Sequence, residues 1–151
     1  MDNVDRATRS RVMFSVKSKN TRPELYFRKL LFHRGFRYTL HNSKITGRPD
    51  LYLKKYNTVV FVNGCFWHRH PDPDCKLTRT PKSRVDYWND KFNKNIERDK
   101  RNSDELKKQG IKKLVIWECT IKKMMKDKTY EQKIMDEVVN FLKNNKMDID
   151  L

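Results

Sequence analysis

The cysteines of the chain, Cys65, Cys75 and Cys119, have the clearest chemical potential. With His70 they form the spacing C-x4-H-x4-C, and Cys119 follows a predicted strand that the fold can bring alongside. Three thiolates and one imidazole are the donors of a closed, tetrahedral zinc site of the structural kind. The alternative is that the cysteines are small buried apolar residues. His68 is a second possible ligand, because it forms C-x2-H with Cys65.

A carboxylate stands at the head of a predicted β-hairpin. Gly47-Arg48-Pro49-Asp50 leads into two predicted strands, 50–56 and 58–63. Mg²⁺ takes hard oxygen ligands, often only one or two from protein, so Asp50 is a candidate ligand in a metal-dependent nuclease. Pro-Asp is also a common turn pair. The second strand lacks the Glu-x-Lys that such hairpins usually carry, so a further catalytic group has to come from elsewhere.

Three other titratable residues are candidates for that group. His68 follows the second strand and can act as a general base or acid near neutral pH. Asp99 lies on the apolar face of a predicted helix and needs a partner there, for which a salt bridge is the ordinary explanation. Glu24 is explained by the T-x-x-E capping box that begins at Thr21, without any catalytic role.

The elements that must position these residues predict an α/β fold. Segment 64–84 has three prolines and little periodicity, so something other than a hydrophobic core must hold it. The order α-α-β-β-β-α-β-α favours a mixed sheet with helices, in a single domain over residues 1–151. The expected helices are 4–17, one from Thr21 to Gly35, 84–109 and 129–144, and the expected strands are 36–40, 50–56, 58–63 and 114–117.

Composition indicates the class of partner. Thirty-five Lys and Arg oppose 19 Asp and Glu, a formal net charge of +16. Phosphate neutralisation with counterion release rewards such a surface, so nucleic acid is the expected partner and an anionic membrane the competitor. No apolar run approaches the roughly 20 residues of a spanning helix. The charged N-terminus lacks the apolar core of a signal peptide, so an intracellular protein is expected.

A series of short motifs follows along residues 5–122. They are Ala7-Thr8-Arg9-Ser10 with Met13, Gly47-Arg48-Pro49-Asp50, Gly64-Cys65-Phe66-Trp67-His68-Arg69-His70, Trp88, Asn95-Ile96-Glu97-Arg98-Asp99-Lys100-Arg101 and Trp117-Glu118-Cys119. In this order the motifs resemble the very short patch repair (Vsr) DNA mismatch endonucleases. The resemblance implies a three-layer, restriction-endonuclease-type core, in which helices flank a central mixed β-sheet, plus a structural zinc site.

The resemblance also implies the roles of the candidate catalytic residues. Asp50 and the main-chain carbonyl of Val62 would hold Mg²⁺, and His68 would be the catalytic histidine. Glu24 and Asp99 would support the site through the outer shell, by hydrogen bonds to water or to histidine. The implied zinc ligands are Cys65, His70, Cys75 and Cys119.

Five apolar residues are implied to contact DNA. Phe66, Trp67 and Trp88 match an aromatic wedge that enters the base stack beside a mismatch. Met13 and Val16, in an N-terminal DNA-contacting helix within residues 1–20, match the opposing minor-groove contact. A wobble pair is unstacked more cheaply than a Watson–Crick pair, which suits recognition by deformation. Core packing is the alternative for Trp67 and especially for Trp88, which lies on the apolar face of helix 84–109.

The chain departs from the family pattern in several places. Val62 stands in place of the family's Thr, so only its carbonyl is available, and Asn63 replaces a histidine of some relatives, so a proton relay through that position is absent. The loop from His70 to Cys75 is longer by about two residues. Residues 122–151, with their predicted C-terminal helix, match only weakly.

The implied activity is Mg²⁺-dependent nicking of one strand, 5′ to the thymine of a T:G mismatch left by 5-methylcytosine deamination. The implied partners are double-stranded DNA with that mismatch and, functionally, a cytosine-5 DNA methyltransferase. A monomer is expected to act on the nucleoid in the cytoplasm of a prokaryote. Two alternatives remain: a related nuclease that nicks another DNA structure, and a zinc-stabilised DNA-binding module without catalysis.

Overall fold

A five-stranded mixed sheet forms the centre of the protein, which the computed structural model describes over residues 19–151. The strands are β1 (Thr39–Leu40), β2 (Leu51–Leu53), β3 (Thr58–Asn63), β4 (Lys112–Trp117) and β5 (Asp148–Asp150), in that order across the sheet. Pairing is antiparallel from β1 to β3 and parallel from β3 to β5. The predicted α/β fold with a mixed sheet is therefore confirmed. The predicted helix 4–17, with Met13 and Val16, lies outside the described residues.

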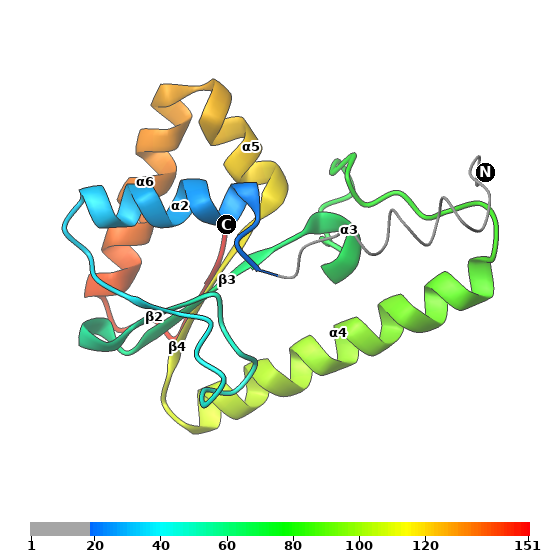
Figure 1. The fold of residues 1–151 in the computed structure, drawn as a ribbon, viewed down its shortest axis with the longest axis horizontal. Coiled ribbons are helices and arrows are strands. Elements are labelled where there is room, and N and C mark those ends of the chain that lie inside the picture. The colour runs from blue at the N-terminus through cyan, green and yellow to red at the C-terminus, as the bar shows by residue number, and fades with distance from the viewer. Residues whose placement is uncertain (1–18) are drawn as a thin grey trace.

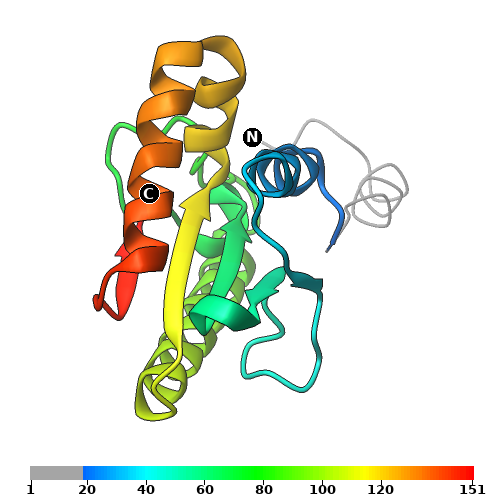
Figure 2. The ribbon, with the colours of Figure 1, turned by 90° about the vertical axis from the view of Figure 1, so that its left-hand side faces the viewer.

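Three helices cover one face of the sheet. These are α2 (Arg22–His33), α5 (Glu118–Lys126) and α6 (Lys128–Lys143), which lie together on one side of the strands (Figures 1 and 2). Each fully buried Leu, Phe or Met contributes about 1.5–3 kcal/mol, so this face holds most of the fold's hydrophobic stabilisation. Its fully buried large side chains are Phe27, Leu31, Leu51, Leu53, Leu114, Ile116, Ile121, Met124, Met135 and Phe141.

The other face is covered by one long helix, α4 (Val85–Lys108), which crosses it as a separate rod (Figure 1). Its buried residues are towards its two ends: Trp88 and Phe92 beside the short helix α3 (Cys65–His68), and Leu106 two residues before the C-terminal residue of α4. Between them Ile96 is 45% exposed, although it shares the predicted apolar face. A cavity of about 730 Å³ separates this middle part of α4 from the sheet.

Local sequence signals account for several boundaries. The Thr21 hydroxyl accepts a hydrogen bond from the Glu24 amide at 3.3 Å and caps α2, as the capping box predicts. The predicted strand 50–56 is shorter, because Lys54–Tyr56 form a 3-10 turn. The helix predicted from Thr129 begins at Lys128, with Asp127 as its cap.

Three elements, the short helix α3 and the later elements α5 and β5, are absent from the predicted order. Helix α5 follows β4 without a loop, and β5 is a three-residue strand at the sheet edge. Within residues 19–151, no helix has the length and apolar character needed to cross a membrane.

Candidate functional site

The parallel pairing of β3 with β4 brings two cysteines together. Asn63 lies opposite Trp117 in the register of these strands. Cys65 and Cys119 each follow two residues later, at the start of α3 and in the first turn of α5. Neighbouring parallel strands end at the same edge of a sheet, so the two side chains emerge side by side.

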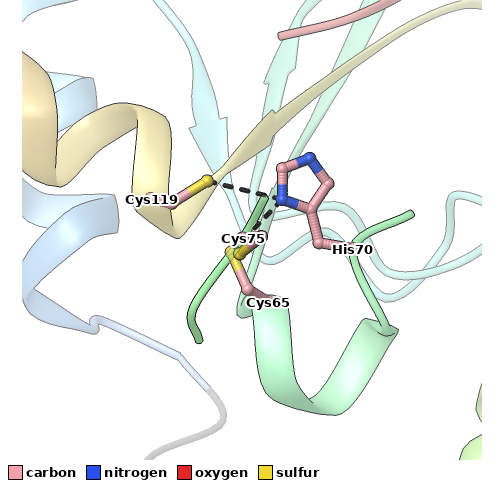
Figure 3. A group of neighbouring side chains, drawn as sticks. All are labelled: Cys65, His70, Cys75 and Cys119. Atoms are coloured by element: carbon pink, nitrogen blue, oxygen red, sulfur yellow. Dashed lines mark hydrogen bonds between the residues drawn. The ribbon is translucent and has the colours of Figure 1, made fainter. Parts of the chain in front are cut away.

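His70 and Cys75 complete this group, which we call the thiol cluster (Figure 3). Arg69 ends α3 in the left-handed region (φ 54°), so the chain reverses and the His70 amide donates to the Cys65 carbonyl at 3.1 Å. The His70 ring stacks on Trp117, and its Nδ1 lies 3.4 Å from Cys119 Sγ and 3.7 Å from Cys65 Sγ. One donor atom from each of the four residues lies within 4.8 Å of the others.

The chemistry of the thiol cluster fits a metal ion. Burial is the main cause that raises the pKa of Cys65 and of Cys119, and the Cys75 thiol raises both further. Metal binding requires thiolates, which only a bound cation would stabilise at this depth. The cluster also lies where segment 64–84 has no periodic core of its own. A metal here would add to the few apolar contacts of that segment, which include Leu77 packed against Val115 and Trp117.

Asp50 lies at the start of β2 and is held against β3. Its Oδ2 accepts a hydrogen bond from the Val62 amide at 2.7 Å. Gly47, in the same motif, adopts φ +83°, and a Cβ there would lie 2.9 Å from the Phe61 ring. Only glycine allows the loop to approach β3 this closely. The motif therefore sets the position from which Asp50 reaches Val62.

The environment of Asp50 opposes a lone negative charge. Burial is the main cause that raises the pKa of Asp50 to about 7, and the Glu24 carboxylate raises it further, while the Val62 amide and His68 lower it. One donor atom each from Glu24, His41 and Asp50 lies within 4.8 Å of the others, and we call this group the carboxylate cluster. Two carboxylates at such a distance repel each other unless a proton or cation lies between them. These oxygen donors fit a hard divalent cation.

Glu24 is more than a capping residue. Its side chain is buried, its Oε1 accepts from the Asn20 amide at 3.1 Å, and its Oε2 accepts from Arg28 at 2.7 Å. The His41 ring contacts the same Oε2 at 3.3 Å. Glu24 thus contributes its main-chain amide to the cap of α2 and its carboxylate to the carboxylate cluster.

His68 and Asp99 form a pair between α3 and α4. His68 Nδ1 lies 2.7 Å from Asp99 Oδ2, and both residues line the cavity beneath α4. The partner that Asp99 requires on its helix face is therefore the histidine. His68 points away from the thiol cluster, so the structure brings His70, and not His68, to the cysteines.

The predicted wedge residues pack against one another. Phe66, Trp67 and Trp88 make edge-to-face or tilted contacts with ring centroids 5.0–6.0 Å apart. Trp88 is 5% exposed, whereas Phe66 and Trp67 are half-buried. The Asn95 amide of α4 donates to the Trp67 carbonyl at 3.1 Å and holds α3 in place.

One member of the carboxylate cluster, His41, was missed by the sequence analysis. It belongs to no motif and reaches Asp50 only through the pairing of β1 with β2. The available signal is weak: a histidine directly after a predicted strand, nine residues before Asp50.

Comparisons with known proteins lead to one class of enzyme. Residues 1–76 match the family model of the DNA mismatch endonuclease Vsr. The type II nicking enzyme V.NmeAIP of Neisseria meningitidis is 48% identical over 114 residues, covering 76% of this chain and 79% of the relative. V.XorIIP of Xanthomonas oryzae, also a type II nicking enzyme, is 40% identical over 80% of this chain and 86% of the relative. The DNA mismatch endonuclease Vsr of Escherichia coli K12 is 36% identical over 78% of this chain and 74% of the relative.

These findings define the chain as a DNA endonuclease. It belongs to the Vsr family, and the resemblance read from the sequence motifs is confirmed.

Proposed function

We propose that the protein is a Mg²⁺-dependent endonuclease that nicks one DNA strand 5′ to the thymine of a T:G mismatch. The observation that carries this proposal is the His68–Asp99 pair, 2.7 Å apart, near the partly buried carboxyl group of Asp50. The names of the relatives support it, since one is a DNA mismatch endonuclease and two are nicking enzymes.

The geometry of the His68–Asp99 pair suits general base catalysis. The Asp99 carboxylate accepts a hydrogen bond from the Nδ1–H group of His68 and so fixes the tautomer whose Nε2 carries a lone pair. His68 Nε2 then takes a proton from the water that attacks the phosphorus, and Asp99 stabilises the resulting imidazolium. Asp99 is therefore a positioning residue that acts through His68.

Asp50 and the main-chain carbonyl of Val62 would hold the Mg²⁺, and Glu24 would support them from the outer shell. When bound, the cation supplies a Lewis acid that polarises the phosphate and stabilises the leaving oxygen. The hydrogen bond from the Val62 amide holds the Asp50 carboxylate in position, and the Arg28 and Asn20 contacts do the same for Glu24.

The metal of the thiol cluster is proposed to be a structural Zn²⁺. Three thiols and one imidazole are the donor set of closed tetrahedral zinc sites. Zinc would hold segment 64–84 and with it α3, on which Phe66, Trp67 and His68 lie.

Recognition of DNA is proposed to combine charge with insertion. The net charge of +16 favours the phosphate backbone. Phe66 and Trp67, which are half-buried, are the accessible part of the aromatic wedge, while the buried Trp88 supports them. Met13 and Val16 would contact the minor groove from the opposite side.

The wider setting is proposed on the family membership. The whole chain, 1–151, would form one monomeric endonuclease domain with a restriction-endonuclease-type core. It would act in the cytoplasm of a prokaryote on the nucleoid, and repair T:G mismatches that arise where a cytosine-5 DNA methyltransferase has acted.

The test is a nicking assay on end-labelled duplexes that differ only in one base pair. We expect Mg²⁺-dependent cutting of the thymine strand of the T:G duplex, and none of the T:A or C:G duplex or in EDTA. Equal cutting of an A:C or a looped duplex would favour the related nuclease of another specificity. Binding without cutting in every metal tested would favour a non-catalytic module.

A further inference from the structure

His41 is held against the proposed cation site by the main chain. It follows β1 directly, and its amide donates to the Asp50 carbonyl at 3.1 Å. Its φ of 47° lies in the left-handed region, which residues with a side chain rarely adopt and which is enriched at functional sites. The conformation turns the imidazole towards Glu24 and Asp50.

The hydrogen bonds of His41 determine which ring nitrogen carries the proton. Nε2 lies 3.3 Å from Glu24 Oε2 and 3.3 Å from Asn20 Oδ1. The amide oxygen of Asn20 is identified by Arg28, which donates to it at 2.9 Å. Both neighbours of Nε2 are therefore acceptors, and Nε2 must be the protonated nitrogen.

The lone pair of His41 then faces a carboxylate oxygen. In the neutral ring the unprotonated atom is Nδ1, which lies 3.9 Å from Asp50 Oδ1. This distance is longer than a hydrogen bond, so the two atoms do not share a proton directly. Asp50 Oδ2 already accepts from the Val62 amide, which leaves Oδ1 as the oxygen opposite His41. Two facing acceptors are stabilised by a cation between them.

We infer that His41 Nδ1 is a direct ligand of the divalent cation that Asp50 holds. This inference rests on the proposed function, because it adds a ligand to the same cation. The site then has one nitrogen donor beside its carboxylate oxygens. Imidazole favours transition metals over Mg²⁺, so the site binds Mn²⁺ more tightly than Mg²⁺.

The experiment uses Mn²⁺ as a spectroscopic probe of the zinc-loaded, full-length protein. Continuous-wave electron paramagnetic resonance gives the dissociation constant of Mn²⁺, and pulsed measurements detect the nuclear modulation of a coordinated ¹⁴N. We expect ¹⁴N modulation in the wild type, and its replacement by ¹⁵N modulation when histidine is ¹⁵N-labelled. The labelled wild type tests nitrogen ligation without any variant.

Three glutamine variants assign the nitrogen. His41→Gln is expected to lose the modulation and to weaken Mn²⁺ binding roughly 10–100-fold. His68→Gln is expected to keep the modulation. His33→Gln is the matched control, because His33 is exposed at the far end of α2, nine residues from Glu24 or about 13 Å along the helix. Zinc content and circular dichroism show whether each variant is folded, and His41→Ala replaces His41→Gln if the latter is not.

Two results would overturn the inference. Bound Mn²⁺ without nitrogen modulation in the wild type would show that His41 is an outer-shell residue, while Asp50-dependent nicking would leave the proposed function intact. Modulation that survives in His41→Gln would assign the nitrogen to another histidine. The proposed function fails separately, if the wild type cuts T:G duplexes in EDTA or cuts nothing.

Discussion

The thiol cluster and the carboxylate cluster both involve strand β3, but their donor groups are held in position differently. Cys65 of the first follows the strand, and Asp50 of the second accepts a hydrogen bond from Val62 within it. The thiol cluster gathers three thiols and one imidazole from segments that begin beyond the ends of β3 and β4, and its donor atoms lie mainly against one another. In the carboxylate cluster each donor is already fixed by the fold, through the Val62 amide for Asp50 and through Arg28 for Glu24. Metal binding to the thiol cluster would therefore contribute free energy to folding, because the bound ion would hold the surrounding segment. The carboxylate cluster is positioned by the fold before any cation binds, which suits catalysis.

The largest expected effect is the loss of the thiol cluster's metal. Structural zinc sites carry apparent binding free energies of about 10–16 kcal/mol, and much of that is folding free energy. Cys119→Ser should therefore lose the zinc and leave segment 64–84 unfolded, measured by metal analysis and limited proteolysis. Lys126→Ser, at the exposed end of the same helix α5, is the control and should keep both. Folded, active protein without zinc would contradict a structural role.

Removing the Asp50 carboxylate should lower the rate of nicking without changing the stability of the fold. Asp50→Ala is expected to abolish nicking of the T:G duplex while thermal stability and zinc content stay at wild-type levels. Binding of the mismatched duplex should persist or tighten in the absence of metal, because a carboxylate that faces a phosphate repels it. Single-turnover nicking and gel-shift assays measure the two effects. Wild-type cutting by this variant would mean that the hairpin has been misread.

His68 tests whether the two clusters are separate. It lies between two thiol-cluster ligands in sequence but pairs with Asp99 in space. His68→Ala should lower the nicking rate roughly 10²–10⁴-fold, the usual contribution of a positioned acid or base, with unchanged zinc content. His70→Ala is the matched variant and should lose zinc. If His68→Ala lost zinc and His70→Ala kept it, His68 would be the zinc ligand and His70 the catalytic histidine.

Trp67 links the thiol cluster to DNA recognition, because α3 is held by the cluster at its first residue. Stacking of a base on an aromatic side chain contributes about 1–3 kcal/mol. Trp67→Ala should therefore reduce the preference for T:G over fully paired duplexes by roughly tenfold to hundredfold, in competition binding assays. Phe32→Ala is the control, because it also replaces an aromatic side chain by alanine but at an exposed position of α2. A variant that unfolds would show that Trp67 is a core residue.

The smallest expected effect is the pH dependence of cation binding. Since the folded pKa of Asp50 is about 7, above the ordinary value of 3.8, protons compete with the cation below neutrality. The carboxyl group is about nine-tenths ionised at pH 8 and one-tenth at pH 6, so affinity for Mn²⁺ should fall about tenfold over that range. Zinc content should not change over the same interval. A pH-independent affinity would show that Asp50 is already ionised before the cation binds.

Local signals made much of the fold predictable, and long-range pairing explains what was missed. The cap at Thr21 and the apolar run of β3 act within a few residues, so the sequence shows them directly. Helix α5 contains three lysines and starts immediately after a strand, and β5 is a tripeptide, Asp148–Asp150, with a single apolar residue, Ile149. Their stability comes from packing and edge pairing that no local pattern records.

The same distinction holds for the candidate site. Type and spacing identified the three cysteines and left His68 and His70 as alternative ligands, and the resemblance to the Vsr family selected His70. The structure brings His70 to the cysteines through a backbone reversal at Arg69, which no local sequence pattern predicts. His41 could not be found at all, because it approaches Asp50 across a strand pair and Glu24 across a helix cap.

The register in which Asn63 faces Trp117 also has a consequence for how the chain reaches its native pairing. If β4 slipped by one residue along β3, Cys119 would move by about 3.3 Å and the side chains of the strand would turn to the opposite face. Cys65 and Cys119 would then no longer meet the same ion. A metal bound by the thiol cluster would therefore favour the correct alignment of the two central strands, because misaligned chains would not complete the coordination sphere or gain its free energy.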